Sequence, residues 1–178
     1  MAEEICDLSN NEDNQPKGYN QSYHHYGGFG CGKTTIARQL AEQLGWKFIE
    51  SDSHHSEEHV RKMASGIPLT DIDRQPWLDT LHALLVDCSQ KNEPVVMACS
   101  ALKEKYRQAL SAGLNNVRFV YLKGDYDLIR ERMQRRRHFM KPEMLKSQFE
   151  ALEEPEDALV IDISSPPDIM IKEILCQI

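Results

Sequence analysis

Residues 27–34 have the sequence Gly-Gly-Phe-Gly-Cys-Gly-Lys-Thr, and this octapeptide decides the fold of the chain. It fits the phosphate-binding loop pattern of Gly, four free positions, Gly, Lys, and Ser or Thr. Few Cβ atoms obstruct the backbone here, so successive N–H groups can turn toward one anion. Lys33 is expected to reach the β and γ phosphates of a nucleotide, and the Thr34 hydroxyl to bind Mg²⁺. The residues expected to contact the nucleotide are Gly27, Gly28, Phe29, Gly30, Cys31, Gly32, Lys33, Thr34 and Thr35.

A helix is predicted to begin where the glycines end. Apolar residues recur at Ile36, Leu40 and Leu44, at the spacing of one helical face. The N-terminus of such a helix carries a partial positive charge, which adds to the attraction of the loop for phosphate. The alternative is a glycine-rich turn that merely precedes an ordinary helix.

The segment before the loop is unusual for this motif. Residues 1–20 are polar and predict a disordered leader, which leaves residues 21–178 as one domain. A phosphate loop normally follows a buried parallel strand rich in Val, Ile and Leu. Residues 22–26 instead have the sequence Ser-Tyr-His-His-Tyr, which predicts a poor central strand.

Downstream, predicted strands alternate with predicted helices. Short apolar runs at residues 46–50, 94–99, 117–122 and 159–163 indicate strands, and amphipathic segments separate them. Pro76 is expected at the first position of the longest helix. This alternation predicts an α/β fold with a parallel sheet and right-handed crossovers, the arrangement of a P-loop nucleoside triphosphatase with helices on both faces.

Composition narrows the class of protein. The chain has 178 residues and a net charge of −7, which argues against a general nucleic-acid-binding role. Five scattered cysteines predict free thiols in a reducing compartment. The N-terminus does not resemble a secretory signal, and no apolar run is long enough to span a membrane, so we expect a cytoplasmic protein.

Two carboxylates follow the predicted strand at residues 46–50. Glu50 and Asp52 are two residues apart at its carboxyl end, the edge where open α/β sheets bind their ligands. They can serve a phosphoryl-transfer site, or they can cap a turn.

Longer motifs carry a resemblance to a known family. Among them are Gly-Trp-Lys-Phe at 45–48, Lys-Met-Ala-Ser-Gly-Ile-Pro-Leu-Thr-Asp at 62–71, Asp-Arg-Gln-Pro-Trp-Leu at 73–78, Ala-Cys-Ser-Ala-Leu-Lys at 98–103 and Ser-Gln-Phe-Glu at 147–150. In these the chain resembles the gluconokinase family, the small P-loop kinases that phosphorylate D-gluconate. The resemblance runs from about residue 27 to the C-terminus. It implies a fold like that of nucleoside monophosphate kinases, with a five-stranded parallel sheet and a small lid, together with ATP, Mg²⁺ and a homodimer.

The resemblance also implies roles for particular residues. Asp52 would hold or deprotonate the reacting hydroxyl, and Glu50 would lie closer to Mg²⁺. The groups that the resemblance offers for the anionic end of the substrate are His55, Arg74, Lys103 and Arg107. Three alternatives stay open for these groups. The basic residues can be solvated surface charges, and His55 can be a structural hydrogen-bond donor or can join His54 and His59 in a metal site.

An arginine-rich stretch predicts the lid, at about residues 134–143. Its arginines are Arg130, Arg132, Arg135, Arg136 and Arg137. Arg132 and Arg136 match arginines of the family, so Arg132 is expected at the nucleotide and Arg136 at the transferring phosphoryl group. A solvated basic helix face and a nucleic-acid patch are the alternatives. The chain lacks the glycine that the family usually carries before His138.

Three functions are compatible with the sequence. The first is ATP-dependent conversion of D-gluconate to 6-phospho-D-gluconate. The second is phosphorylation of a shikimate-like or other sugar acid by a related kinase. The third is a catalytically impaired isoform with an altered N-terminus, which acts only by pairing with an intact subunit.

Overall fold

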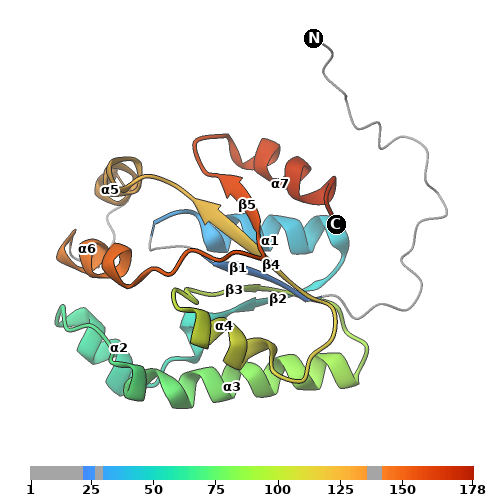
Figure 1. Cartoon of the computed structure of the whole chain (residues 1–178), viewed down its shortest axis with the longest axis horizontal. Coiled ribbons are helices and arrows are strands. Elements are labelled where there is room, and N and C mark those ends of the chain that lie inside the picture. Colours follow the sequence, from blue (N-terminus) through green and yellow to red (C-terminus); the bar gives the residue numbers. More distant parts are fainter. Residues whose placement is uncertain (1–21, 27–29, 136–141) are drawn as a thin grey trace, which may run out of the picture.

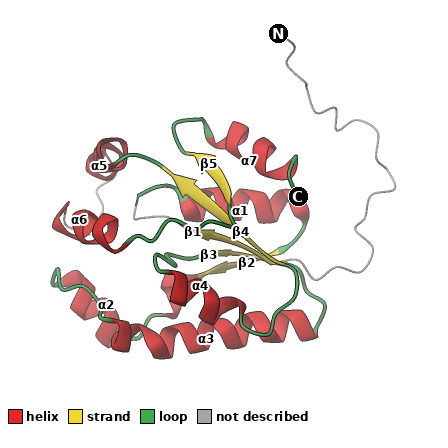
Figure 2. Cartoon of the chain, in the orientation of Figure 1, coloured by secondary structure: helices red, strands yellow, loops and turns green. Residues whose placement is uncertain are grey.

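The computed structural model describes residues 22–26, 30–135 and 142–178. The predicted leader at 1–20 and most of the predicted lid lie outside this part of the chain. Strands and helices alternate in the order β1 (Ser22–Tyr26), α1 (Lys33–Leu44), β2 (Lys47–Glu50), η1 (Ser51–His54), α2 (Glu57–Ala64), α3 (Asp71–Gln90), β3 (Val95–Ala98), α4 (Glu104–Ser111), β4 (Val117–Lys123), α5 (Tyr126–Arg135), α6 (Pro142–Ala151), β5 (Leu159–Asp162) and α7 (Pro167–Leu175). Figure 1 and Figure 2 show the helices packed on both sides of the strands.

The strands form a sheet of order β2-β3-β1-β4-β5, in which each neighbouring pair is parallel. β1 therefore lies in the middle, with Ser22 opposite Val95 of β3 and Val117 of β4. The expectation that residues 22–26 would make a poor central strand is wrong. Pairing uses backbone N–H and C=O groups, which each residue from 22 to 26 supplies because none is proline.

β3 shows how the sheet is covered on its two faces. Its four residues are all buried, and they alternate between two apolar clusters. Val96 and Ala98 pack with α1 and α7, whereas Val95 and Met97 pack with α3 and α4. A parallel strand covered by helices on both faces is expected to be apolar throughout, as this one is.

The longest helix begins earlier than predicted. α3 begins at Asp71, and Pro76 lies inside it, so the prediction of Pro76 as the first helical residue is wrong. The start is set by a capping box: the Thr70 hydroxyl accepts a hydrogen bond from the Asp73 N–H at 3.2 Å, and Asp73 Oδ2 accepts one from the Thr70 N–H at 2.7 Å. Two orphan N–H groups are thereby satisfied, which stabilises the first turn ahead of the proline.

Replacing Thr70 with alanine is expected to lower the free energy of unfolding by about 1 kcal/mol, because the Asp73 N–H loses its acceptor. Urea unfolding of the two proteins measures the difference. Thr70→Ser retains the hydroxyl and is the control. If alanine and serine at this position gave equal stability, the cap would not stabilise α3.

Two further sequence predictions concern the described residues. No described helix is long and apolar enough to cross a membrane. The cysteines in this part of the chain are all free thiols, as predicted; Cys31, Cys88 and Cys99 are buried and Cys176 is exposed.

Candidate active site

The described end of the glycine-rich loop is shaped to bind an anion. Gly30 and Gly32 have φ angles of 80° and 99°, in the left-handed region that favours glycine. Gly32 precedes α1, whose first turn has neither a side-chain cap nor an acidic residue. The N–H groups of that turn therefore lie at a positive helix end with no acidic residue in the turn itself. Gly27, Gly28 and Phe29 lie outside the described residues.

Gly30 also requires a residue without a side chain for reasons of packing. A Cβ atom at this position would lie 2.7 Å from Cγ of Met133, on α5. Any substitution would thus push the loop away from α5 as well as strain its backbone. The loop and the helix that leads toward the predicted lid are therefore in direct contact.

A cavity of about 300 Å³ adjoins this loop. It is lined by Cys31, Gly32, Thr35, Arg132 and Arg135, together with residues at the start of α7. The structure therefore brings Thr35 and Arg132 together with the loop, where both were predicted to bind nucleotide. Arg132 is held in place because its Nη2 donates to the Ile163 carbonyl at 2.7 Å. Arg136 lies outside the described residues.

The two predicted carboxylates lie at the carboxyl end of β2. Glu50 ends β2 and Asp52 lies one residue beyond the buried Ser51. All three charged groups, Lys33, Glu50 and Asp52, act electrostatically on the thiol of Cys99, whose pKa is raised to about 12 chiefly by burial. Glu50 at the end of β2 lies opposite Ala98 at the end of β3, and these strand ends and the start of α1 are all within electrostatic range of the same thiol.

Trp77 of α3 fixes the turn that carries Asp52. Its indole Nε1 donates to the Ser51 carbonyl at 2.9 Å, and its ring is 3% exposed. The His55 ring stacks on the same indole, with centroids 4.5 Å apart and an interplanar angle of 13°. A buried aromatic side chain therefore positions both Asp52 and His55.

A pocket of about 110 Å³ brings four predicted residues together: Asp52, His55, Arg74 and Lys103. Its other polar lining residues are Asp71, Ser100, Tyr106, Ser147 and Gln148. Among the described residues, three buried polar atoms at this pocket have no hydrogen-bond partner: Nδ1 of His55, Nε of Arg74 and Oγ of Ser100. Buried polar atoms are costly when unpaired, so these atoms favour a polar ligand.

The structure does not bring Arg107, the remaining residue of the predicted set, to this pocket. Its side chain is 3% exposed and faces away, toward a separate groove. Nη1 donates to the carbonyls of Ala101 and Leu102, and Nη2 forms an ion pair with Glu104 at 2.7 Å. Arg107 therefore supports the turn between β3 and α4, which corrects its expected position beside the substrate.

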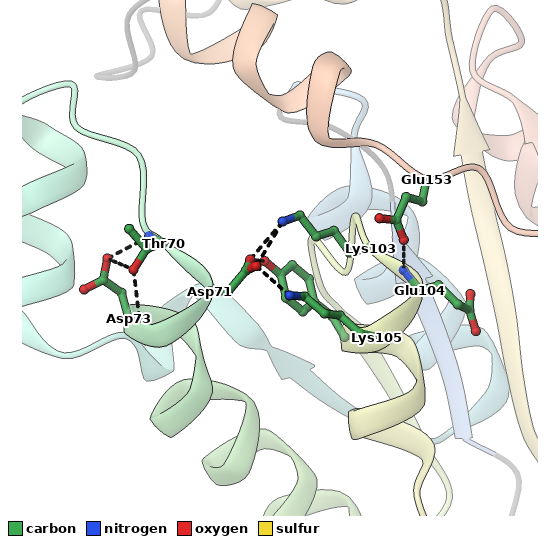
Figure 3. Close-up of polar contacts among 8 residues, drawn as sticks. Thr70, Asp71, Asp73, Lys103, Glu104, Lys105 and Glu153 are labelled. Atoms are coloured by element: carbon green, nitrogen blue, oxygen red, sulfur yellow. Dashed lines mark hydrogen bonds and ion pairs between the residues drawn. The ribbon is translucent and has the colours of Figure 1, made fainter.

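Asp71 also lines this pocket, although the sequence did not indicate it as a site residue. Figure 3 shows its carboxylate bound by two lysines: Lys103 Nζ lies 2.9 Å from Oδ1, and Lys105 Nζ lies 2.5 Å from Oδ2. The Tyr106 hydroxyl donates to the same carboxylate. The hydrogen bonds from Lys105, Tyr106 and Lys103 lower the pKa of Asp71.

The Tyr106 ring collects further positive charge. Arg74 Cζ and the Nζ atoms of Lys103 and Lys105 all lie within 5.8 Å of its centroid. Three cations thus surround the Tyr106 ring, and two of them bind the Asp71 carboxylate, so positive charge is concentrated here on a protein whose net charge is −7. The sequence does not show which of the neighbouring residues Lys103, Lys105 and Tyr106 line the pocket, and only the fold does.

The pH dependence of stability should report the environment of His55. Burial lowers its pKa from 6.5 to about 4, with Arg74 and His59 adding to the shift and Asp52 opposing it. As the pH falls from 6.5 toward 4, the unfolded chain takes up this proton before the folded protein does. We therefore expect the free energy of unfolding to fall over this window by about 1 kcal/mol more than in His55→Gln, after allowance for solvent screening of a half-buried ring. Urea unfolding at pH 7 and pH 5 measures it, and equal losses would contradict the assignment.

Comparison with known proteins places this site in a class. The family model described as shikimate kinase matches residues 29–165. A shikimate kinase from Aquifex aeolicus shares the fold, with a TM-score of 0.54 and 16% sequence identity over 88% of this chain and 95% of that one. With the glycine-rich loop and the pocket beside it, these matches define a P-loop kinase of the shikimate-kinase-like class.

More similar proteins narrow the class. The thermoresistant gluconokinase of Escherichia coli K12 is 43% identical over 155 residues, which cover 83% of this chain and 89% of that one. A probable gluconokinase of Mus musculus is 46% identical over 144 residues, covering 71% and 78%. A gluconokinase from Sinorhizobium meliloti has a TM-score of 0.80 and 39% identity, covering 89% and 91%. The chain belongs to the gluconokinase family.

Proposed function

We propose that this protein transfers the γ-phosphoryl group of ATP to D-gluconate and forms 6-phospho-D-gluconate. One observation carries the proposal: the pocket gathers a carboxylate, Asp52, with two cations, Arg74 and Lys103. A sugar acid, which has both a hydroxyl that can react and a carboxylate, matches this combination of groups. The family relationship supports the same substrate.

The loop and the first turn of α1 would hold the phosphates. The N–H groups of this turn and the positive helix end would attract them, and Lys33 adds a charge. Thr34 is exposed at the same turn, and its hydroxyl and the Glu50 carboxylate are oxygen donors of the kind that Mg²⁺ prefers. Mg²⁺, when bound there, would neutralise charge on the transferring group.

Asp52 would act on the substrate hydroxyl. Its carboxylate is exposed to the pocket and its backbone is fixed through the indole of Trp77. From there it can accept the proton of the 6-hydroxyl or hold its oxygen in line for transfer.

Arg74 and Lys103 would bind the sugar carboxylate. Arg74 offers a guanidinium whose buried Nε has no partner among the described residues. The guanidinium and the Lys103 ammonium both lie over the Tyr106 ring. His55, kept neutral by burial, would hydrogen-bond a hydroxyl of the substrate. A guanidinium can bind a carboxylate through two parallel hydrogen bonds, which fixes its orientation.

Other parts of the proposal rest on the family relationship and the sequence. A lid at about residues 134–143 would close over ATP, with Arg136 contacting the transferring phosphoryl group and Arg132 the nucleotide. We further propose a cytoplasmic homodimer with a kinase domain at 21–178 and a disordered leader at 1–20, acting on a small molecule without nucleic-acid or membrane partners.

A coupled assay tests the function. ATP consumption is measured with D-gluconate, with shikimate and with other sugar acids, and Lys33→Ala serves as the inactive control. Turnover of gluconate alone supports the proposal, whereas turnover of shikimate or another acid in its place favours the related kinase. Absence of turnover with every acid and absence of an ATP-dependent thermal shift would favour the impaired isoform; the central position of β1 argues against that outcome.

A further inference from the structure

Gln148 of α6 lines the same pocket as Asp52 and Lys103. Its side chain is 6% exposed, so its amide is almost fully removed from solvent. The charged residues that line the pocket are Asp52, Asp71, Arg74 and Lys103. Among the residues that line it, Gln148 is the one amide.

The backbone of Gln148 is firmly anchored. On the same helix, Leu145 is fully buried in the core, and the Phe149 ring packs edge-on against Tyr126 with centroids 5.3 Å apart. These contacts hold one side of α6 against α5 and leave Ser147, Gln148 and Ala151 on the side that faces the pocket. The amide therefore has a defined position rather than a freely moving one.

The chain beyond α6 links the position of Gln148 to that of Lys103. The Glu153 N–H donates to the Leu102 carbonyl at 2.8 Å, and the Glu153 carboxylate accepts from the Glu104 N–H at 2.7 Å (Figure 3). Lys103 lies between these two bonded residues. The spacing between Gln148 and Lys103 is thus set by a helix and by two hydrogen bonds to the backbone.

A glutamine amide both donates and accepts hydrogen bonds, as a hydroxyl does, whereas a carboxylate only accepts them. We propose that Gln148 hydrogen-bonds a chain hydroxyl of the sugar acid, at a fixed distance from the carboxylate. Gln148 is then a specificity-determining residue that selects polyhydroxy acids over acids lacking a hydroxyl at that place. This inference rests on the proposed function, which assigns the carboxylate to Arg74 and Lys103.

The test combines one substitution with altered substrates in the full-length protein. Gln148→Met keeps the volume of the side chain and removes the amide. With D-gluconate, we expect kcat/KM to fall about 10- to 100-fold, mostly through KM, because a buried hydrogen bond is lost. The unsubstituted enzyme should lose a similar factor with the one monodeoxygluconate that lacks the partner hydroxyl. With that analogue, Gln148→Met should cause no further loss, because the hydrogen bond is already lost when the hydroxyl is absent.

Two controls separate recognition from folding. Gln90→Met makes the same substitution at an exposed position at the end of α3 and should leave kcat/KM unchanged. Gln148→Asn keeps the amide but withdraws it by one methylene, and it should lose activity with gluconate while keeping the thermal midpoint of the ligand-free protein.

The outcomes are distinct. If Gln148→Met lowers activity equally with gluconate and with every monodeoxy analogue, or not at all, then Gln148 does not bind a substrate hydroxyl. This inference is then overturned, while the proposed function stands. If the unsubstituted protein fails to phosphorylate gluconate, the proposed function is rejected and this inference with it.

Discussion

Lys33→Ala is expected to lower kcat for gluconate phosphorylation about 1000-fold, because the positive charge that faces the transferring phosphoryl group is lost. Lys33 is the first residue of α1, and its Nζ lies 4.0 Å from the buried Sγ of Cys31. The N–H groups of the loop remain in the variant. The affinity for ATP should therefore fall much less than kcat.

The measurement is a coupled assay at saturating gluconate, with an ATP thermal shift on the same preparations. Alanine favours helix, so the start of α1 should be preserved. Lys91→Ala is the matched control, since Lys91 is an exposed lysine paired only with its neighbour Asp87 in the described contacts. If Lys33→Ala kept a tenth or more of the activity, this lysine would not serve the reaction.

Asp52→Asn is expected to lower kcat by about 100- to 10 000-fold, with little change in the KM for gluconate. Asparagine has nearly the same shape as aspartate but cannot accept a proton from the 6-hydroxyl. Because Asp52 is exposed and bound to no described side chain by a hydrogen bond or ion pair, the fold should change in stability by no more than about 0.5 kcal/mol.

Steady-state kinetics with gluconate and ATP, and urea unfolding, measure the two parts of this expectation. Asp79→Asn is the control: Asp79 is exposed on α3 and accepts a hydrogen bond from Gln75, far along the chain from the strand ends. A loss confined to KM would mean that Asp52 binds the sugar without assisting transfer. Full activity in Asp52→Asn would remove it from the site.

Local patterns were enough to predict most elements. The glycines and Lys33 predicted the loop, the recurrence of Ile36 and Leu40 predicted α1, and the apolar run at 94–99 predicted β3. The capping box of Thr70 and Asp73 is also a local pattern, and it indicates the start of α3 at Asp71, ahead of Pro76.

Other features depended on contacts between distant segments. Arg107 matches a family motif as well as Arg74 does, but the carbonyls of Ala101 and Leu102 turn it away from the pocket. Asp71 and Gln148 carry no local signal of a binding role. Their importance follows from the packing of α3, α4 and α6 around one pocket.

The sequence by itself determined the class of protein: a glycine-rich loop before an amphipathic helix, strands in alternation with helices, and paired carboxylates at a strand end. These are local properties, because glycine conformation and side-chain periodicity depend on near neighbours. Only the tertiary structure decided that polar residues 22–26 form the central strand and that Arg74, Lys103, Asp71 and Gln148 share a pocket with Asp52. Strand pairing and pocket lining join residues far apart in the chain, so their geometry exists only once the helices have packed onto the sheet.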